Sequence, residues 1–471
     1  MRFTSYEFLF LFLPFALLFY HVLSKFKSSQ LGKIFLNLLS ILFCASLGIL
    51  SVIVLILSLV VNYTIGFLTN RLQQKTQGAL SKSLFIAGIG YNLGSYAIII
   101  ILIFMNQEVS NWFTTSFWNI PFAVPLGLGV ITLHQISFLI NIGLKNAAMP
   151  TFTDYTLYIS FFPQLPAGPV SSYDWAIKQY ENMSDKKITS ESLADGLKVF
   201  AVGLFKKAVL ADSLAVYVNN GYGLDQLGLI PAWLTALSFT FLIYFELSGV
   251  CDMAVGIGRM FQFKLPFSFI SPYTARGLQE YWHSFNATVI QNLEETIETT
   301  KVKTSGILSE SIGIFVILLL GSFWFGFSPG ILLWGVLQGL FTILEIKNQR
   351  ILQKIPGIVT SVLTFLLTTL LWVLFRAETL AKAGSIYKGM VTFWEPGLEQ
   401  MRVFVREGTS YFPDIANTVY FFVLFILSII LCFFGKSTSL LAKKSTRSIA
   451  SAVLTGILLI AAVICTTRSG F

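Results

Sequence analysis

The stretch SFWFGFSPGILLWGVLQGLF, residues 322–341, is an apolar run of the length that crosses a lipid bilayer. Further apolar runs recur along the chain, at 8–23, 35–68 (long enough for two helices), 84–105, 122–142, 307–325, 331–344, 358–375, 419–434 and 449–465. A membrane β-barrel would instead show alternating segments of about ten residues. The sequence therefore predicts an all-α polytopic membrane protein with roughly 11 to 13 membrane segments.

The composition excludes a water-soluble domain. The chain has 471 residues, of which 55% are hydrophobic and 12% are charged, whereas soluble domains carry about 25% charged residues. The formal net charge is +9, and the lysines and arginines gather between apolar runs, as they do in cytoplasmic loops. The four cysteines show no paired spacing. We therefore expect membrane lipid around the chain, no nucleic-acid partner and no metal site.

The middle of the chain, residues 152–260, interrupts the apolar pattern. Pro163, Pro166 and Pro169 follow one another closely, and glycines break the later runs. Interrupted helices are tolerated at membrane depth only where protein or a water-filled cavity satisfies the backbone. This region is therefore predicted to be the functional core.

Several polar segments within the apolar chain carry a family resemblance. They include LYISFFPQLPAGPVSSY at 157–173, GLFKKAVLADSLA at 203–215 and YFELSGVCDMAVGIGRMFQF at 244–263. Together and in this order, these segments resemble the membrane-bound O-acyltransferase (MBOAT) family, in its bacterial alginate O-acetylation branch. The resemblance covers nearly the whole chain, and it is less close to the teichoic-acid D-alanyl transfer branch.

The resemblance implies one transmembrane domain, 1–471, in which a ring of helices surrounds a central tunnel. Its parts would be N-terminal spans at 1–150, the family core at 151–376, and an external loop with C-terminal spans at 377–471. A family member passes an acyl group from an activated cytoplasmic donor, an acyl thioester such as acetyl-CoA or an acyl carrier, to a hydroxyl across the membrane. No bound cofactor is implied, and the location would be the bacterial cytoplasmic (inner) membrane.

Three positions at which the family carries histidine read differently in this chain. The usual run Q-D-F-W-R-R-W-H corresponds to QEYWHSFN, so the resemblance places Asn286 at the histidine and His283 at an arginine. The usual W-H-G reads WFG, with Phe325 at the histidine. The usual W-G-x-x-H-G reads WGVLQG, with Gln338 at the histidine. The resemblance thus implies a degenerate histidine site at Gln338 and Asn286.

An amide at a histidine position changes the chemistry that is available. Activating a hydroxyl for attack on a thioester requires a base with a pKa near neutrality, which histidine supplies. A glutamine forms hydrogen bonds but does not titrate in that range. Gln338 is therefore interpreted either as a polar plug between helices or as a substrate contact without proton transfer. His283 is the candidate replacement for the base.

The same resemblance indicates further candidate residues. Lys206 and Lys207 either contact the acyl donor or its carrier, or anchor a cytoplasmic helix end. His134 is a functional candidate because it lies in an apolar run, but packing explains it equally well. Asp252, like Glu246, is expected to pair with a cation such as Arg259 or Lys206. The residues predicted to line the tunnel are Pro163, Gln164, Gly168, Asp252, His134, Trp324, Phe325 and Trp334.

Two functions follow from these observations. The first is acyl transfer, with acetyl as the expected group, across the membrane to an extracytoplasmic polysaccharide. The second is a catalytically inactive family member that acts as a scaffold, conduit or regulator in a polysaccharide-modifying complex. Either one implies an extracytoplasmic, esterase-like acetyltransferase and a polysaccharide synthase as partners, and a cytoplasmic carrier protein as a possible donor.

Overall fold

The computed structural model describes most of the chain, namely residues 1–26, 29–46, 48–75, 77–112, 127–181, 183, 188–299, 328–393, 397–405, 414–443 and 448–468. The predicted span at 307–325, which includes Trp324 and Phe325, lies outside these residues.

Helices dominate the described residues, and seven of them are long and apolar enough to cross a membrane. These are α3 (Ile49–Gln74), the part Gly78–Ile101 of α4 (Gly78–Trp112), α10 (Leu229–Met260), α14 (Pro329–Lys347), α16 (Gly357–Arg376), Ala416–Phe434 in α19 (Asp414–Ile429) and η6 (Ile430–Phe434), and Ile449–Thr466 in α21 (Ile449–Arg468). The prediction of an all-α polytopic membrane protein is confirmed. The count of roughly 11 to 13 membrane segments, which follows from the length that a helix needs to cross the bilayer, stays a prediction.

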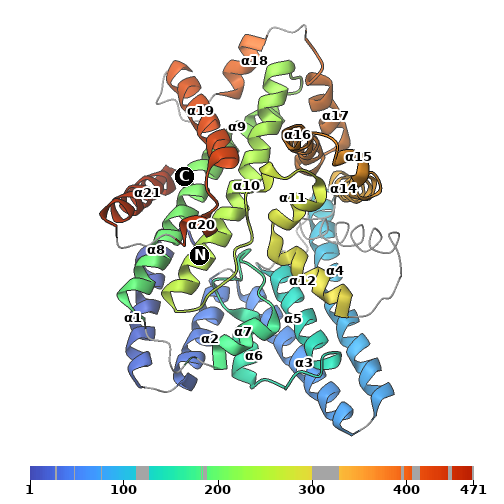
Figure 1. Cartoon of the computed structure of the whole chain (residues 1–471), viewed down its shortest axis with the longest axis vertical. Coiled ribbons are helices and arrows are strands. Elements are labelled where there is room, and N and C mark those ends of the chain that lie inside the picture. The colour runs from blue at the N-terminus through green and yellow to red at the C-terminus, as the bar shows by residue number, and fades with distance from the viewer. Residues whose placement is uncertain are drawn as a thin grey trace. The chain divides into compact units, whose positions relative to one another are not determined.

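Shorter helices connect and flank these spans. Three of them are apolar: η1 with α1, Glu7–Leu23; α2 (Ser29–Ala45); and α5 (Leu128–Gly143). The others are η2 (Ser24–Phe26), α6 (Phe152–Ser160), α7 (Tyr173–Glu181), α8 (Ser190–Phe205), η4 (Lys206–Ala211), α9 (Asp212–Gly223), η5 (Pro272–Thr274), α11 (Leu278–Ser284), α12 (Ala287–Thr299), α15 (Gln349–Leu352), α17 (Leu380–Gly389), α18 (Gly397–Phe404) and α20 (Thr438–Leu441). Figure 1 shows their course along the chain.

The chain forms two compact units. Unit 1 comprises Met1–Phe200, Val250–Pro266 and Gln291–Lys303, and unit 2 comprises Ala201–Gly249, Phe267–Ile290 and Thr304–Phe471. Helix α10 thus contributes its first part to unit 2 and its last part to unit 1. The single domain with the parts 1–150, 151–376 and 377–471 stays a prediction.

In unit 1, a network of buried amides joins three apolar helices. Asn62 of α3 donates through Nδ2 to Oε1 of Gln135 in α5, at 2.8 Å. Asn92 of α4 donates through Nδ2 to Oδ1 of Asn62, at 2.6 Å. Polar bonds of this kind between membrane helices contribute about 0.6 to 2 kcal/mol each. The network therefore fixes the register of α3, α4 and α5.

The run 35–68 divides into two helices, as the sequence predicts. Helix α2 ends at Ala45 and α3 begins at Ile49, and Gly48 between them has φ of 129°. An L-residue with a side chain rarely adopts this conformation, whereas glycine does so readily. Gly48 therefore allows the chain to break here.

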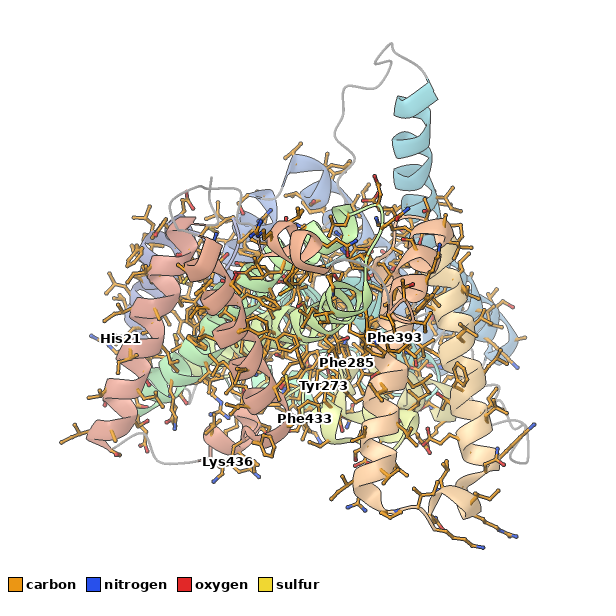
Figure 2. All side chains as sticks on the ribbon, turned by 90° about the horizontal axis from the view of Figure 1, so that it is seen from above. His21, Tyr273, Phe285, Phe393, Phe433 and Lys436 are labelled. Carbon is orange, nitrogen blue, oxygen red and sulfur yellow. The ribbon has the colours of Figure 1, made fainter. Side chains whose placement is uncertain are left out.

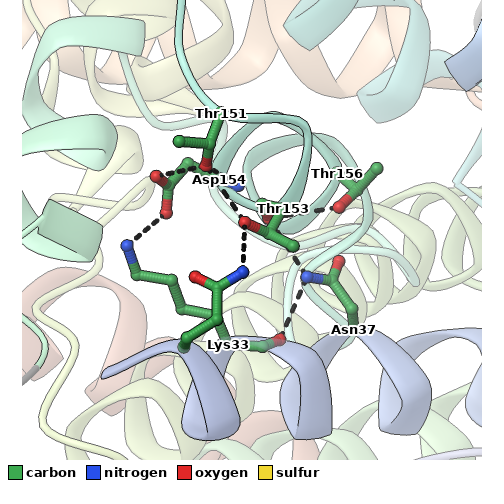
Figure 3. A network of polar contacts seen from close by, with 7 residues as sticks. Lys33, Asn37, Thr151, Thr153, Asp154 and Thr156 are labelled. Atoms are coloured by element: carbon green, nitrogen blue, oxygen red, sulfur yellow. Dashed lines mark hydrogen bonds and ion pairs between the residues drawn. The ribbon is translucent and has the colours of Figure 1, made fainter. Parts of the chain in front are cut away.

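A polar face of α2 holds the start of α6, also within unit 1 (Figure 3). The Lys33 ammonium forms an ion pair with the Asp154 carboxylate at 2.7 Å. Asn37 donates to the carbonyl of Thr153 at 3.1 Å, and Ser40 accepts a hydrogen bond from the backbone N–H of Phe162 at 3.0 Å. These α2 residues are three or four positions apart, so they share one helix face. They position both α6 and the proline-rich segment that follows it.

Helix α10 runs unbroken for 32 residues despite the glycines in its second half, so the predicted interruption of the middle region is wrong for this part. The glycines serve close packing instead. A Cβ at Gly256 would lie 2.5 Å from the backbone nitrogen of Phe200 in unit 1, and one at Gly249 would lie 2.8 Å from the carbonyl oxygen of Gly203 in unit 2. Small residues let membrane helices approach to backbone contact. The interruption holds at 161–172, which lies outside helices.

Aromatic rings fill the interior of unit 2. Figure 2 labels three of its members, Tyr273, Phe285 and Phe433. The Tyr273 ring lies 5.3 Å from that of Phe365, which in turn lies 5.0 Å from that of Phe433. The Tyr273 hydroxyl donates to the carbonyl of Thr240 in α10. Stacked and edge-on pairs of this kind add about 0.5 to 1.5 kcal/mol each beyond burial.

Candidate functional site

Gln338 lies on the buried face of α14 and forms a hydrogen bond with α11. The indole N–H of Trp282 donates to Oε1 of Gln338 at 3.3 Å, and the Gln338 side chain is fully buried. Because an indole nitrogen can only donate, this contact fixes which end of the amide faces Trp282. The Nε2 donor of Gln338 is directed to another side and has no hydrogen-bond partner within the described parts of the chain.

Helices α11 and α14 are joined a second time, two turns further along α14. The Glu345 carboxylate accepts a hydrogen bond from the backbone N–H of Leu278, at the first turn of α11. A Cβ at Gly277 would displace this carboxylate from its present position. Residues 278 and 282 of α11 thus meet residues 345 and 338 of α14, which sets the two helices antiparallel. Glu345 was not among the predicted residues; its signal in the sequence is a lone carboxylate seven residues after Gln338 in an apolar run.

A cluster of tryptophans surrounds this contact. Trp334 stacks on Trp372 of α16 with ring centroids 5.2 Å apart, and it meets Trp282 edge-on at 5.7 Å. The Trp372 indole N–H donates to the Tyr281 hydroxyl at 3.2 Å. Burial raises the pKa of the Tyr281 phenol far above its usual range, so this hydroxyl keeps its proton. The tunnel candidate Trp334 therefore belongs to the same cluster as Gln338.

Asn286 and His283 lie at the end of α11, next to this cluster. Asn286 has φ of 57°, the left-handed region that asparagine tolerates better than most residues. Its carbonyl accepts from the N–H of Val289 at 3.0 Å, in the first turn of α12. Both side chains are half-buried. The backbone conformation gives Asn286 a structural role in the turn, and His283 follows directly after Trp282.

Lys206 and Lys207 occupy a π-helical turn, η4, between α8 and α9. Such single turns occur often at functional sites. The Lys207 ammonium lies 2.7 Å from the carboxylates of both Asp212 and Glu246. Burial opposes its charge, but the carboxylates of Glu246 and Asp212 outweigh this effect and raise the pKa of Lys207 above its ordinary value.

These contacts assign the two lysines different surroundings. Lys207 balances two carboxylates, and the predicted pairing of Glu246 with a cation is confirmed, with Lys207 as the partner. Lys206 donates to the Thr438 hydroxyl at 2.9 Å and lies 5.6 Å from the centre of the Tyr244 ring. A contact of either lysine with a donor or carrier stays a prediction.

His134 and Gln164 come together in unit 1. Gln164 donates through Nε2 to the carbonyl of Pro169 at 2.6 Å and to the Ser171 hydroxyl at 2.8 Å. The backbone N–H of Ser171 in turn donates to Nε2 of His134 at 3.3 Å. A nitrogen that accepts from an amide is neutral, so the proton of this imidazole is assigned to Nδ1. His134 thus packs as a neutral acceptor against the proline-rich segment.

The proline-rich segment also packs closely against its own backbone and contacts α10. A Cβ at Gly168 would lie 2.5 Å from Cα of Gln164, which requires the bend to carry a glycine there, and Pro163 begins the same bend. The Cys251 thiol donates to the carbonyl of Ala167 at 3.1 Å. Its neighbour Asp252 is buried on α10. The structure therefore brings Pro163, Gln164, Gly168 and His134 together in unit 1, whereas Gln338, Trp334, Asn286 and His283 belong to unit 2.

Comparison with known proteins agrees with this architecture. The sequence model of "MBOAT, membrane-bound O-acyltransferase family" matches residues 134–374. A peptidoglycan O-acetyltransferase of Helicobacter pylori is 31% identical over 424 residues, which cover 83% of this chain and 79% of the relative.

The chain belongs to the membrane-bound O-acyltransferase family.

Other MBOAT relatives span two branches. A probable alginate O-acetylase AlgI of Pseudomonas aeruginosa is 28% identical over 405 residues, covering 83% of this chain and 75% of the relative. A teichoic acid D-alanyltransferase of Streptococcus thermophilus is 20% identical over 282 residues, covering 56% of this chain and 66% of the relative. The predicted resemblance is confirmed, with the alginate branch more similar than the teichoic-acid branch. The roles of individual site residues stay predictions.

Proposed function

We propose that this MBOAT protein transfers an acyl group, specifically acetyl, from a cytoplasmic donor across the membrane to hydroxyls of an extracytoplasmic polysaccharide. The observation that carries the proposal is the similarity, over more than four-fifths of the chain, to proteins named for O-acetylation of peptidoglycan and of alginate. Both names describe the same reaction on a polysaccharide outside the cytoplasm. The comparisons give no support to a non-catalytic scaffold, which remains the alternative that the experiment below addresses.

The donor in this proposal is an acyl thioester, either acetyl-CoA or an acylated carrier protein. The location is the bacterial inner membrane, because activated thioesters are cytoplasmic and the polymer lies outside. The proposed partners are an extracytoplasmic, esterase-like acetyltransferase that completes delivery and the synthase of the polymer. No metal or bound cofactor is part of the proposal.

His283 is the proposed proton acceptor. The chain contains only three histidines, His21, His134 and His283. His134 accepts a backbone hydrogen bond through Nε2 within a buried cluster, and His21 precedes the family match at residues 134–374. His283 lies inside the match, is half-buried and follows the tryptophan that binds Gln338. Gln338 in this proposal orients the substrate and exchanges no proton.

The test is a gene deletion complemented with variants, followed by mass analysis of acetyl groups released from the surface polymer. Deletion should abolish the acylation, and the wild-type gene should restore it. Loss of a general base lowers the rate about 10² to 10⁴-fold, so His283→Ala should leave the polymer unacylated. The matched control, His21→Ala, removes a histidine outside the family match and should restore acylation fully.

Two results would contradict these statements separately. Unchanged polymer acylation in the deletion strain would overturn the proposed function. Full acylation with His283→Ala would overturn the role of His283 only. If His283→Ala, His134→Ala and Gln338→Ala all restored acylation while the deletion abolished it, the scaffold function would replace the enzymatic one.

A further inference from the structure

Two buried hydrogen-bond donors of α14 are without a partner in the part of the chain that the structure describes. Nε2 of Gln338 and Nε1 of Trp334 are both buried, and neither has a hydrogen-bond partner within the described residues. Buried polar groups in native proteins are nearly always paired, and each exception requires an explanation, such as a catalytic role or a bound water or ion. Trp372, whose ring stacks on Trp334, differs in this respect, because its buried N–H donates a hydrogen bond to the Tyr281 hydroxyl.

The two donors belong to one place in unit 2. Residues 334 and 338 are four positions apart, so they lie one above the other on the same face of α14. Both side chains contact Trp282: the Trp334 ring meets it edge-on at 5.7 Å, and Oε1 of Gln338 accepts from its N–H at 3.3 Å. Trp334 and Gln338 thus both contact a single indole.

The chemistry of this pair selects the kind of ligand atom. An indole N–H and an amide NH₂ only donate, and the one acceptor of Gln338 is already used by Trp282. The surrounding rings of Trp282, Trp334 and Trp372 are aromatic, and burying an anion among such rings with two neutral donors is unfavourable. A neutral oxygen that accepts without donating fits the pair, and a carbonyl oxygen is of that kind.

We infer that Gln338 and Trp334 bind the carbonyl oxygen of the acyl thioester, Gln338 through Nε2 and Trp334 through Nε1. In this two-donor site the amide of Gln338 takes the place of the imidazole that the family resemblance implies at position 338. The inference rests on the proposed function, since it specifies which part of the donor this site takes. Two donors at the acyl carbonyl also polarise its C=O bond toward nucleophilic attack. Gln338 thereby contributes to the reaction without accepting a proton.

The probe for this inference is a ketone analogue of acetyl-CoA, in which a methylene separates sulfur from a ¹³C-labelled carbonyl so that no acyl group can leave. Its carbonyl stretch is measured by isotope-edited infrared spectroscopy on the full-length protein in lipid nanodiscs, together with its affinity by calorimetry. A carbonyl that accepts two hydrogen bonds absorbs at lower frequency than one among aromatic rings alone.

The variants separate the donors from the packing. Trp334→Phe and Gln338→Met each keep the apolar volume but remove one free donor, so each should shift the carbonyl band to higher frequency and weaken binding about tenfold. Trp372→Phe is the matched control, because it removes an N–H that is already bonded to Tyr281 and should leave the carbonyl band in place.

The outcomes decide the inference without deciding the proposed function. A carbonyl band that moves with Trp334→Phe and Gln338→Met but not with Trp372→Phe supports it. An identical band in all four proteins, or no binding of the probe to the wild-type protein, overturns it. Polymer acylation in the complemented deletion strain still tests the proposed function in either case.

Discussion

The ion pair between Lys33 and Asp154 predicts a large loss of stability when only one partner is removed. Both side chains are more than nine-tenths buried, at 8% and 7% exposure, and their charged atoms lie 2.7 Å apart (Figure 3). The Thr151 hydroxyl donates to the other carboxylate oxygen of Asp154 at 2.7 Å. Lys33→Met removes the cation and leaves this carboxylate buried with a single neutral donor.

The magnitude follows from the burial. Breaking a buried ion pair by removing one partner costs about 3 to 5 kcal/mol, since the remaining charge has lost its hydration without compensation. Unit 1 contains an internal comparison, the pair Lys145 and Glu295, whose side chains are 30% and 42% exposed at a similar distance of 2.5 Å. Water screens such a pair, and removing one partner should cost about 0 to 1 kcal/mol.

The assay is reversible unfolding of the full-length protein in mixed micelles with increasing fractions of sodium dodecyl sulfate, which yields a free energy of unfolding. Lys33→Met should lower it by about 3 to 5 kcal/mol, and Lys145→Met by less than about 1 kcal/mol. The double variant Lys33→Met with Asp154→Asn should regain most of the loss, because no charge is then left unpaired. Equal effects of Lys33→Met and Lys145→Met, or no recovery in the double variant, would refute the burial argument.

Three further predictions concern other parts of the fold. Gly256→Leu should prevent folding, because the new side chain would collide with the backbone of α8. The control Gly90→Leu places its side chain in open space and should leave the yield of monodisperse protein unchanged. Equal yields of the two variants would contradict the close packing at Gly256. Glu345→Leu should lower the free energy of unfolding by about 1 to 3 kcal/mol, because it leaves the Leu278 N–H unpaired. Glu345→Gln should lower it less, because an amide oxygen can still accept the hydrogen bond. Unfolding in mixed micelles measures both effects. The raised pKa of Lys207 stabilises the folded state at every pH below 10.5, the ordinary value for lysine, and this contribution is lost only as the pH rises through the folded value. The difference in melting temperature between the wild-type protein and Lys207→Met should therefore be the same at pH 8 and at pH 7. A difference that is smaller at pH 7 would contradict the raised pKa.

The membrane fold could be predicted from the sequence because span length and low charge are direct consequences of the bilayer. The division of 35–68 into two helices also followed from length alone. The continuity of α10 could not be predicted, because glycines in a membrane helix have two opposite meanings. They can break a helix, or they can let another helix approach its backbone, as Gly256 and Gly249 do. Only the neighbouring helix distinguishes these cases.

The contacts of the candidate residues could be predicted only in part. The resemblance located Gln338 and Trp334, and the structure places both beside Trp282. The role of Glu345 could not be predicted because its partner, the N–H of Leu278, is a backbone group with no signature in the sequence. The partners of Lys207 could not be assigned either, since two carboxylates and two cations within three segments allow several pairings.

The position of Gln338 explains how an amide can stand where the family pattern has a histidine without disturbing the helices around it. The N–H of Trp282 requires an acceptor at residue 338. A neutral imidazole would supply one nitrogen as that acceptor and present its other nitrogen as a donor. Glutamine supplies the same pair of functions, an oxygen toward Trp282 and an N–H on the other side, but it cannot change its protonation state. The exchange therefore preserves the hydrogen bond to Trp282 without a group that titrates near neutrality. Under the roles proposed above, ligand binding at Gln338 and basicity at His283 can be removed one at a time.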